Sequence, residues 1–309
     1  MANDRLGVRW GFAGGVAVSS VAEARGAASF AEQAGFDGVW ISQAAGVDPI
    51  VALACCAEAA PELSEFGTSI VPLYGRHPLP VAQLTRTAQN ALGGRFTLGV
   101  GAASQFYASK LGQNWDRPFS FTRDFVAGLL PLLRGDAVDY AGEQLSTHAE
   151  LAIEASDTPV LLAALGPKML RFAGGHLAGT TLGQCGPKTI ADYVIPALQE
   201  GAAAAGRTEP VRVMALVRVC LTDDHAGARQ HAEEVSSFYQ SFPSYQRVIQ
   251  KEGLAHPADL HVIGNWQQIL DSLAAYAEAG VTDLRVEASA HTPAATQATR
   301  AALAEYLNG

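Results

Sequence analysis

Short apolar runs alternate along this chain with longer stretches in which apolar residues recur at helical spacing. One helical stretch, 48–60, starts with Asp48 and then Pro49, a favoured residue at the first helical position. Eight runs are predicted to be strands: 5–12, 36–42, 65–72, 95–102, 158–166, 179–185, 211–222 and 282–288. Helices are predicted at 20–35, 48–60, 78–91, 119–134, 167–176, 187–205, most of 224–279 and 294–308, with a hairpin arm at 137–145.

Eight strands alternating with helices predict an α/β fold, a (β/α)8 TIM barrel formed by a single domain over residues 1–309. A doubly wound sheet is the alternative, but it usually has fewer strands or a second domain. Insertions near 103–118 and 236–262 break the rhythm. Active sites of such barrels lie at the C-terminal ends of the strands. Topology alone therefore selects Gly11 to Gly15, Ser42 and Gln43, Val71 to His77, Gly101 to Tyr107, Leu165 to Lys168, Gly183 to Cys185, and Glu287 onward.

The third strand ends unusually. In "TSIVPLYGRHPLPVAQL" (68–84) the β-branched run stops at Pro72, and Arg76-His77-Pro78 follow before the next helix. Irregular backbone at a barrel mouth suits ligand binding. His77 is a candidate proton donor or phosphate ligand, and a structural role beside the helix start is the alternative.

Two helix starts share the residues Gly-Pro-Lys, in "ALGPKML" (164–170) and "GQCGPKT" (183–189). Free backbone N–H groups at a helix start suit a phosphate, and Lys168 adds positive charge. An ordinary helix start with proline at its first position explains the same residues. Both interpretations stay open on the residues alone.

Three further features have a structural explanation beside a functional one. "GVGAAS" (99–104) lacks the third glycine of a dinucleotide fingerprint, and a strand approached closely by a neighbour or ligand explains it better. Gln43 can hydrogen-bond a heteroaromatic ring or simply face water. Cys185 is expected to be a small packed residue rather than a nucleophile.

Composition and charge limit the classes of function that are expected. The 309 residues are 49% apolar and carry a formal net charge of −9, so nucleic acid and anionic membranes are not expected as partners. The four cysteines lack metal-ligand spacing and are expected to be free thiols. No export signal and no apolar run of about 20 residues is visible, so a cytoplasmic protein is expected. No hydrolytic triad, carboxylate pair, Walker loop or metal motif is present, and no metal is predicted.

Longer stretches carry a resemblance to a known family. "AGFDGVWIS" (34–42), "GTSIVPLYGRHPLPVAQ" (67–83), "GGRFTLGVGA" (93–102), "LLAALGPKMLRFAGGHLAGT" (161–180) and "YAEAGVTDLRV" (276–286) are similar to the bacterial luciferase-like superfamily. "AALGPKML", and the Ser-Gln pair after the second strand, resemble its coenzyme F420-dependent oxidoreductases. The resemblance covers nearly the whole chain.

The resemblance implies a barrel whose mouth holds a tricyclic cofactor, with a non-prolyl cis peptide at Ser69-Ile70 behind the ring. It also implies a set of site residues. The cofactor-binding set is Ser42, Gln43, Ser69, Ile70, Val71, Gly101, Ala102, Leu165, Gly166, Pro167, Lys168, Gly183, Gln184 and Cys185. The candidate substrate-binding residues are Phe12, Phe106, Tyr107 and Trp115, and the candidate catalytic residues are Gln43 and His77.

One residue departs from the family pattern. Many F420-dependent members place a histidine just after the second strand, where this chain has Gln43. Glutamine is not a general acid at neutral pH. Reduction of an imine or a conjugated C=C is therefore favoured over histidine-driven alcohol oxidation or ketone reduction. Substitute proton donors are Tyr74, His77, Tyr107 and His148.

The resemblance therefore predicts an F420-dependent oxidoreductase. A hydride would pass between the deazaflavin C5 and a small organic substrate, an imine, a conjugated C=C or a carbonyl compound. The alternatives are an FMN-dependent monooxygenase using reduced flavin and O₂, and a non-catalytic flavin-binding barrel. A homodimer is expected because superfamily members are often dimers.

Overall fold

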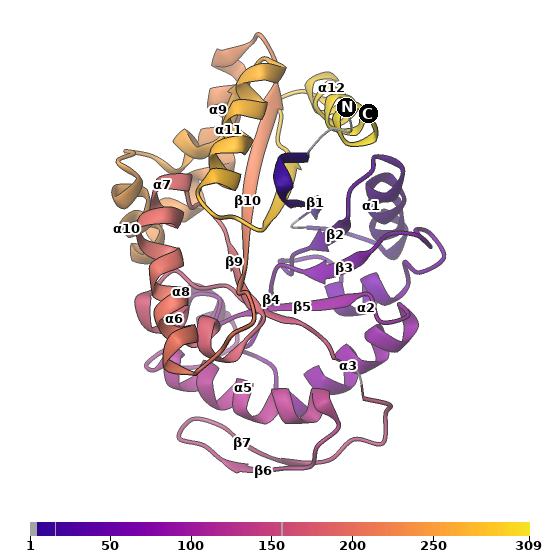
Figure 1. Ribbon diagram of the computed structural model, residues 1–309, viewed down its shortest axis with the longest axis vertical. Coiled ribbons are helices and arrows are strands. Elements are labelled where there is room, and N and C mark those ends of the chain that lie inside the picture. Colours follow the sequence, from indigo (N-terminus) through magenta and orange to yellow (C-terminus); the bar gives the residue numbers. More distant parts are fainter. Residues whose placement is uncertain (1–4, 16, 156) are drawn as a thin grey trace. The chain divides into compact units, whose positions relative to one another are not determined.

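The computed structural model describes residues 5–15, 17–155 and 157–309, in which parallel strands alternate with helices (Figure 1). The residues before Arg5, on which the expectation about export partly rests, lie outside this description. The chain forms two compact units. The first contains the described residues up to Ala13, Ser29–Val39 and Ala164–Gly309, and the second contains Gly14–Ala28 and Trp40–Ala163.

The first unit is organised around the long strand β10 (Arg212–Leu221) (Figure 1). β9 (Gly179–Leu182) and β11 (Val262–Gly264) run parallel to successive stretches of β10. β12 (Asp283–Ala288) also pairs with β10, and β1 (Arg9–Gly15) pairs with β12. The helices of this unit are α6 (Pro167–His176), α7 (Pro187–Thr189), α8 (Ile195–Ala204), α9 (His225–Ser236), α10 (Pro243–Glu252), α11 (Trp266–Glu278) and α12 (Pro293–Asn308).

The second unit is organised around β5 (Phe96–Gly101), which pairs in parallel with β3 (Glu65–Thr68), β4 (Val71–Pro72) and β8 (Val160–Leu162). Its helices are α2 (Pro49–Ala54), α3 (Pro78–Ala91), α4 (Gln105–Lys110) and α5 (Pro118–Arg134). Three elements run from one unit into the other: β1, α1 (Val21–Gln33) and β2 (Gly38–Ile41). β6 (Val138–Ala141) and β7 (Ser146–Ala149) form an antiparallel hairpin.

A buried carboxylate of α5 holds the hairpin. Asp124 accepts hydrogen bonds from the Tyr140 hydroxyl at 2.9 Å and from the backbone N–H of Gln144 at 2.6 Å. Burial alone would raise the pKa of Asp124, but these bonds and the Arg123 guanidinium hold it below its ordinary value. The predicted hairpin is therefore tied to the helix before it.

The strands are built from fully buried apolar residues. Phe66, Leu98, Val100 and Leu161 are inaccessible in the second unit, as are Val219, Leu284 and Val286 in the first. Such continuous apolar runs are typical of parallel strands that are covered on both faces. Gly67 is required here, because a Cβ at this position would overlap the Trp40 ring.

The predicted alternation of strands and helices is confirmed, and the bounds of the helices at 78–91 and 167–176 agree. Several predicted elements differ. Residues 5–7 form a 3₁₀ turn, so the first strand begins at Arg9. The helix expected at 48–60 ends at Ala54. The strand expected at 65–72 is two short strands, and the predicted loop 103–118 contains α4.

The stretch 187–205 was predicted as a single helix. It consists of α7, a π-helical turn over Ile190–Val194 and α8. Within the segment 224–279, expected to be largely helical, lies β11, which the apolar pattern missed because it has only three residues.

Candidate active site

The strand predicted at 65–72 is interrupted between β3 and β4, at Ser69 and Ile70. The peptide bond between Ser69 and Ile70 is cis, as the family resemblance implied. The Ser69 N–H donates to the Ile41 carbonyl at 2.9 Å, and the Gln43 N–H donates to the Ile70 carbonyl at 3.0 Å. The Ser42 hydroxyl also donates to the Ser69 carbonyl. The two predicted site segments after β2 and β3 are therefore joined by backbone hydrogen bonds.

Arg76 fixes the orientation of the Gln43 side chain. Its Nη2 donates to Gln43 Oε1 at 2.7 Å and forms an ion pair with Asp48. Asp48 is itself held in place, because its carboxylate caps α2 by accepting from the N–H groups of Ile50 and Val51. A guanidinium can only donate, so the amide oxygen of Gln43 faces Arg76 and the NH₂ group is left as the available donor.

His77 uses both ring nitrogens within the protein. Nδ1 accepts from the Leu79 N–H at 3.2 Å and so caps α3, while Nε2 lies 3.0 Å from the Ser146 carbonyl. These two bonds fit a neutral imidazole that carries its proton on Nε2. They match the structural alternative for His77, and its catalytic role stays a prediction.

Gly101 allows β5 to pass close to the Ser69–Ile70 segment. A Cβ at Gly101 would lie 3.0 Å from Ile70 Cδ1 and 3.1 Å from the Ala163 Cβ. In the β4–β5 register Val71 pairs with Val100, and Pro72 pairs with Gly101. The predicted residues Ser42, Gln43, Ser69, Ile70, Val71, Gly101 and Ala102 thus lie on adjacent segments of the second unit.

The predicted substrate-binding aromatics are in different surroundings. Trp115 packs against Tyr74 with ring centroids 4.8 Å apart, and Tyr74 stacks on Phe121 at 4.3 Å. Burial, with a smaller contribution from Asp116, raises the pKa of Tyr74. Phe106 is 51% exposed, and Lys110 lies over its ring. Tyr107, also in α4, donates its backbone N–H to the Ser104 cap.

Phe12 lies in the first unit and is 2% exposed. Its ring contacts Phe30 and Phe36, with centroids 4.8 Å and 5.4 Å away, and the Arg300 guanidinium lies 5.4 Å above it. These contacts give Phe12 a packing role between β1 and the helices, and they do not support the predicted contact with substrate.

The first Gly-Pro-Lys turn begins α6 in the first unit. Gly166 is the N-cap, and no side chain caps the helix. Nothing lies within 4 Å of the position a Gly166 Cβ would take, and Pro167 and Lys168 are exposed. The carbonyl of Leu165 accepts from the Tyr193 hydroxyl at 3.1 Å, which anchors the turn. The N–H groups that begin α6 are therefore accessible to an anion.

The second predicted wall segment of this unit is buried. Gln184 is 3% exposed with a φ of 53°, and its Nε2 has no hydrogen-bond partner among the described residues. Cys185 is 2% exposed, and burial, aided by Glu252, raises the pKa of its thiol. A buried thiol of this kind is not activated as a nucleophile. The amide of Gln184 is the group in this segment that still needs an acceptor.

Comparison with known proteins identifies the family. The luciferase-like monooxygenase family model matches residues 9–283. The chain belongs to the luciferase-like monooxygenase family. The predicted resemblance is thus confirmed.

Relatives of this luciferase-like protein include enzymes named for coenzyme F420 or for a methanopterin substrate. It is 28% identical to the 5,10-methylenetetrahydromethanopterin reductase of Methanolobus tindarius over 239 residues, 77% of this chain and 73% of the relative. It is 34% identical to the F420-dependent glucose-6-phosphate dehydrogenase of Beutenbergia cavernae over 215 residues, 64% of each chain.

A solved structure shows the fold. The coenzyme F420-dependent tetrahydromethanopterin reductase of Methanopyrus kandleri superposes with a TM-score of 0.83 at 22% identity, covering 97% of this chain and 98% of the other. The luciferase-like fold, a (β/α)8 barrel of the α/β class, is therefore confirmed for this chain.

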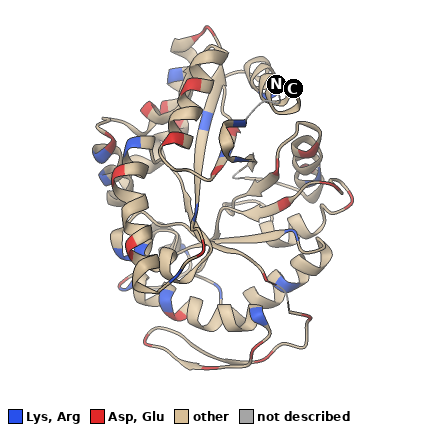
Figure 2. Cartoon of the chain, viewed as in Figure 1, with Lys and Arg blue, Asp and Glu red and all other residues tan. Residues whose placement is uncertain are grey.

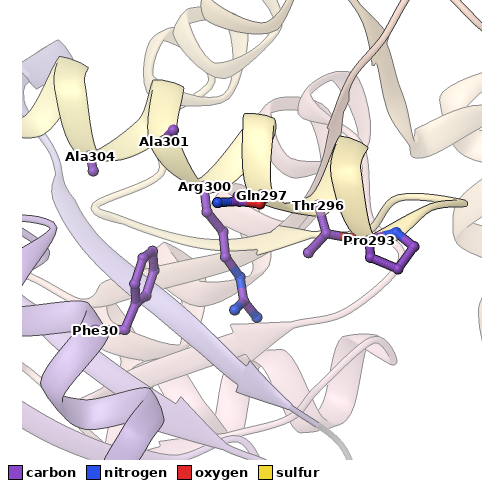
Figure 3. Close-up of a pocket in the computed structure, with 7 residues that line it drawn as sticks. All are labelled: Phe30, Pro293, Thr296, Gln297, Arg300, Ala301 and Ala304. Atoms are coloured by element: carbon purple, nitrogen blue, oxygen red, sulfur yellow. The ribbon is translucent and has the colours of Figure 1, made fainter.

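The first unit of the luciferase-like protein has a groove (Figure 3), and the predicted residue Phe12 contacts two of the residues that line it. It has a volume of about 470 Å³ and is lined by Phe30 of α1 and by one face of α12, including Arg300 and Ala304. In Figure 3 the Arg300 side chain extends from α12 toward Phe30. None of the predicted site residues lines it.

No group of three or more His, Cys, Asp or Glu side chains among the described residues could hold a metal ion. No described helix is both long enough and apolar enough to cross a bilayer. Both acidic and basic residues occur along the helices of this luciferase-like protein (Figure 2).

Sequence analysis selected Glu287 from topology but missed four residues in its surroundings. Arg218 lies on β10 and Arg285 on β12, and Tyr239 and Tyr245 lie within the 236–262 insertion. The Tyr245 hydroxyl is 4.0 Å from the position of a Cβ on Gly183, a predicted cofactor-binding residue. The available signal was the charged residues at alternating positions of two strands that were otherwise predicted to be buried.

Proposed function

We propose that the protein is an F420-dependent oxidoreductase that transfers a hydride between the deazaflavin and a small organic substrate. Support comes from the relatives named for F420, together with one structural observation. That observation is the uncapped start of α6, where accessible N–H groups and an exposed Lys168 suit the phosphate of a cofactor tail. Bound F420 would supply the hydride acceptor or donor at its C5 carbon.

The residues present fit such a cofactor. Gly166, Pro167 and Lys168 offer an open anion site, and the buried Gln184 amide lacks an acceptor that a polar heterocycle would supply. In the second unit, Gly101 leaves no room for a side chain beside Ile70. We infer that these segments, with Ser42 to Gln43, Ser69 to Val71, Ala102, Leu165, Gly183 and Cys185, hold the cofactor.

Gln43 is proposed to orient the substrate rather than to protonate it. Arg76 binds its carbonyl oxygen, so its NH₂ group can donate a hydrogen bond to a nitrogen or oxygen of the substrate. A donor that keeps its proton is best matched to an imine or a conjugated C=C, which needs less acid assistance than a carbonyl. His77 is a weaker proposal as proton donor, because both its nitrogens already have partners.

Three properties complete the proposal. We infer a cytoplasmic enzyme and a homodimer, on the residue patterns and family resemblance already given. We also infer that Trp115 and Tyr107 line the substrate pocket, where the packing of Trp115 on Tyr74 gives a rigid aromatic surface.

Direct binding tests the cofactor. F420 titrated into the purified protein should bind at micromolar concentration, followed by the change in deazaflavin fluorescence, while FMN should not compete. Tight FMN binding with NAD(P)H-coupled oxygen uptake would instead indicate a flavin monooxygenase. Binding of neither cofactor would favour a non-catalytic barrel.

A further inference from the structure

The groove between α1 and α12 is a cavity that the proposed hydride transfer does not use (Figure 3). We call it the Arg300 groove. Its volume of about 470 Å³ falls in the range of small-molecule sites, roughly 300 to 1,000 Å³. Its lining residues all belong to the first unit. Phe30 comes from α1, and the side chains from α12 include Thr296, Gln297, Arg300, Ala301 and Ala304.

One face of α12 packs inward and a second face lines the groove. Thr299 and Leu303 are inaccessible, and the Thr299 hydroxyl accepts from the Leu221 N–H of β10 at 2.9 Å. On the groove face the side chains of Ala301 and Ala304 are too short to fill the space beside the helix. The groove is therefore open and largely apolar, which is typical of a site that takes up an apolar group.

The opposite wall of the groove is a fixed aromatic ring. Phe30 packs edge-on against Phe12, with ring centroids 4.8 Å apart, and Phe12 is only 2% exposed. Phe36 contacts the same two rings. Because the core holds Phe30 in place, this wall exists before any ligand binds, and a ligand does not have to order it.

Arg300 brings a positive charge to this apolar groove. Its guanidinium lies 5.3 Å from the Phe30 centroid and 5.4 Å from the Phe12 centroid. Within the part of the chain that the structure describes, Arg300 makes no hydrogen bond and no ion pair. Arg25 of α1 differs, because it pairs with Glu58. A guanidinium keeps its charge at neutral pH, so the donors of Arg300 are available to an external anion.

We propose that the Arg300 groove binds an aliphatic carboxylate, with its carboxylate on the Arg300 guanidinium and its alkyl chain against Phe30, Ala301 and Ala304. One guanidinium balances one negative charge, which favours a carboxylate over a phosphate group that carries nearly two. The apolar lining favours an alkyl chain over a polar metabolite, because burial of apolar surface drives the binding. This site is independent of the proposed oxidoreductase function.

The test is isothermal titration calorimetry of the full chain with three probes: octanoate, butanoate and octan-1-ol. Octanoate should bind at one site per chain. Each methylene added between butanoate and octanoate should tighten binding by about two- to fourfold, since each is removed from water. Octan-1-ol has the chain without the charge and should bind more weakly than octanoate.

Arg300→Met tests the charge. It keeps an apolar stem and removes the guanidinium, so octanoate should bind about three- to tenfold more weakly, while octan-1-ol affinity should change by less than about twofold. Arg25→Met removes an exposed arginine of α1 that does not line the groove. It is the matched control and should leave both affinities unchanged.

Ala304→Leu tests the space. A larger side chain in the groove should weaken octanoate and octan-1-ol alike, by about tenfold. Ala298→Leu makes the same change at an exposed position of α12 that does not line the groove, and it should leave both affinities unchanged. Leucine and alanine both favour helix, so α12 should be retained, and circular dichroism checks this. The Arg300 comparison stands even if Ala304→Leu folds poorly.

Several results would overturn the proposal. They are no octanoate binding, equal affinity for octanoate and octan-1-ol, and an octanoate affinity that neither Arg300→Met nor Ala304→Leu changes. Displacement of octanoate by F420 would place the carboxylate at the candidate active site instead. Loss of a dimer in Ala304→Leu, without octanoate binding to the parent, would assign the groove to a second copy of the chain. A protein that binds octanoate as described but does not bind F420 would contradict the proposed function alone.

Discussion

The first unit contains two helix starts with the same residues and different surroundings. Gly166-Pro167-Lys168 begins α6, and Gly186-Pro187-Lys188 begins α7; both N-cap glycines are extended, with φ of −92° and −87°. At the second start the Glu252 carboxylate accepts from the N–H groups of Lys188 at 3.1 Å and Thr189 at 2.7 Å. At the first start no side chain takes that place.

The difference shows that the residues Gly-Pro-Lys alone do not decide whether a helix start is capped by the protein or left open. Both starts present N–H groups that need an acceptor. The protein provides its own anion at α7, whereas at α6 the acceptor must come from water or a ligand. Both lysines are exposed, but Lys188 contacts Asp192 and the Lys251 carbonyl within the protein. Identical residues therefore serve packing at one start and remain available for binding at the other.

The largest expected effect comes from adding a methyl group to each N-cap. A Cβ at Gly186 would displace the Glu252 carboxyl group from its capping position, so Gly186→Ala should lower the free energy of unfolding by about 1 to 2 kcal/mol. Gly166→Ala should cost less than about 1 kcal/mol, the ordinary effect of alanine at an N-cap. Urea unfolding of both variants measures the difference, and equal costs would contradict the distinction drawn between the two starts.

Removal of each lysine should separate binding from structure. Lys168→Ala is expected to weaken F420 binding by about tenfold, the loss of one charge-assisted phosphate contact. Lys188→Ala serves as the matched control and should leave F420 affinity unchanged. Fluorescence titration measures both, and an unaltered affinity in Lys168→Ala would rule out its phosphate role.

Glu252→Ala should turn the capped start into an open one. Two backbone donors, one exposed and one partly buried, lose their acceptor, so the free energy of unfolding is expected to fall by about 1 kcal/mol. Glu252→Gln keeps an acceptor oxygen and should cost less. If chemical denaturation gives the two variants the same stability as the parent, the carboxylate is not acting as a cap.

Lys188→Ala is expected to have the smallest effect, a small change in the free energy of unfolding. Its ion pair with Asp192 spans 3.4 Å, but 61% and 66% of the two side chains are exposed. Exposed pairs of this kind contribute little, so the change should stay within about 0.5 kcal/mol. A larger loss in the unfolding curve would mean that the contact to the Lys251 carbonyl carries more than the ion pair.

Local patterns predicted the order of elements well. The helix at 78–91 has proline at its first position and a regular apolar stripe, and its bounds agree with the structure. Short elements were missed because their signal is too brief, as with β11 and with α4, which has six residues. The division of 65–72 depends on hydrogen bonds to the β2 turn, which no local pattern reports.

The sequence indicated which residues belong to the candidate site, but it did not indicate which residues contact them. Its strand-end residues follow from barrel topology, and the cis peptide followed from the family resemblance. The partners could not be predicted, because each contact joins distant positions: Arg76 binds Gln43 from 33 residues away, and Glu252 caps α7 from 64 residues away. Burial of Arg285 was also hidden, since a charged residue in a strand more often faces solvent.

The contact between Arg76 and Gln43 has a consequence for attempts to re-engineer this enzyme. A histidine placed at position 43 would meet a guanidinium that is already held by Asp48. The adjacent cation would disfavour the protonated imidazole, so the new side chain would be a poor acid at neutral pH. A histidine that stays protonated at position 43 therefore requires a second substitution, at Arg76.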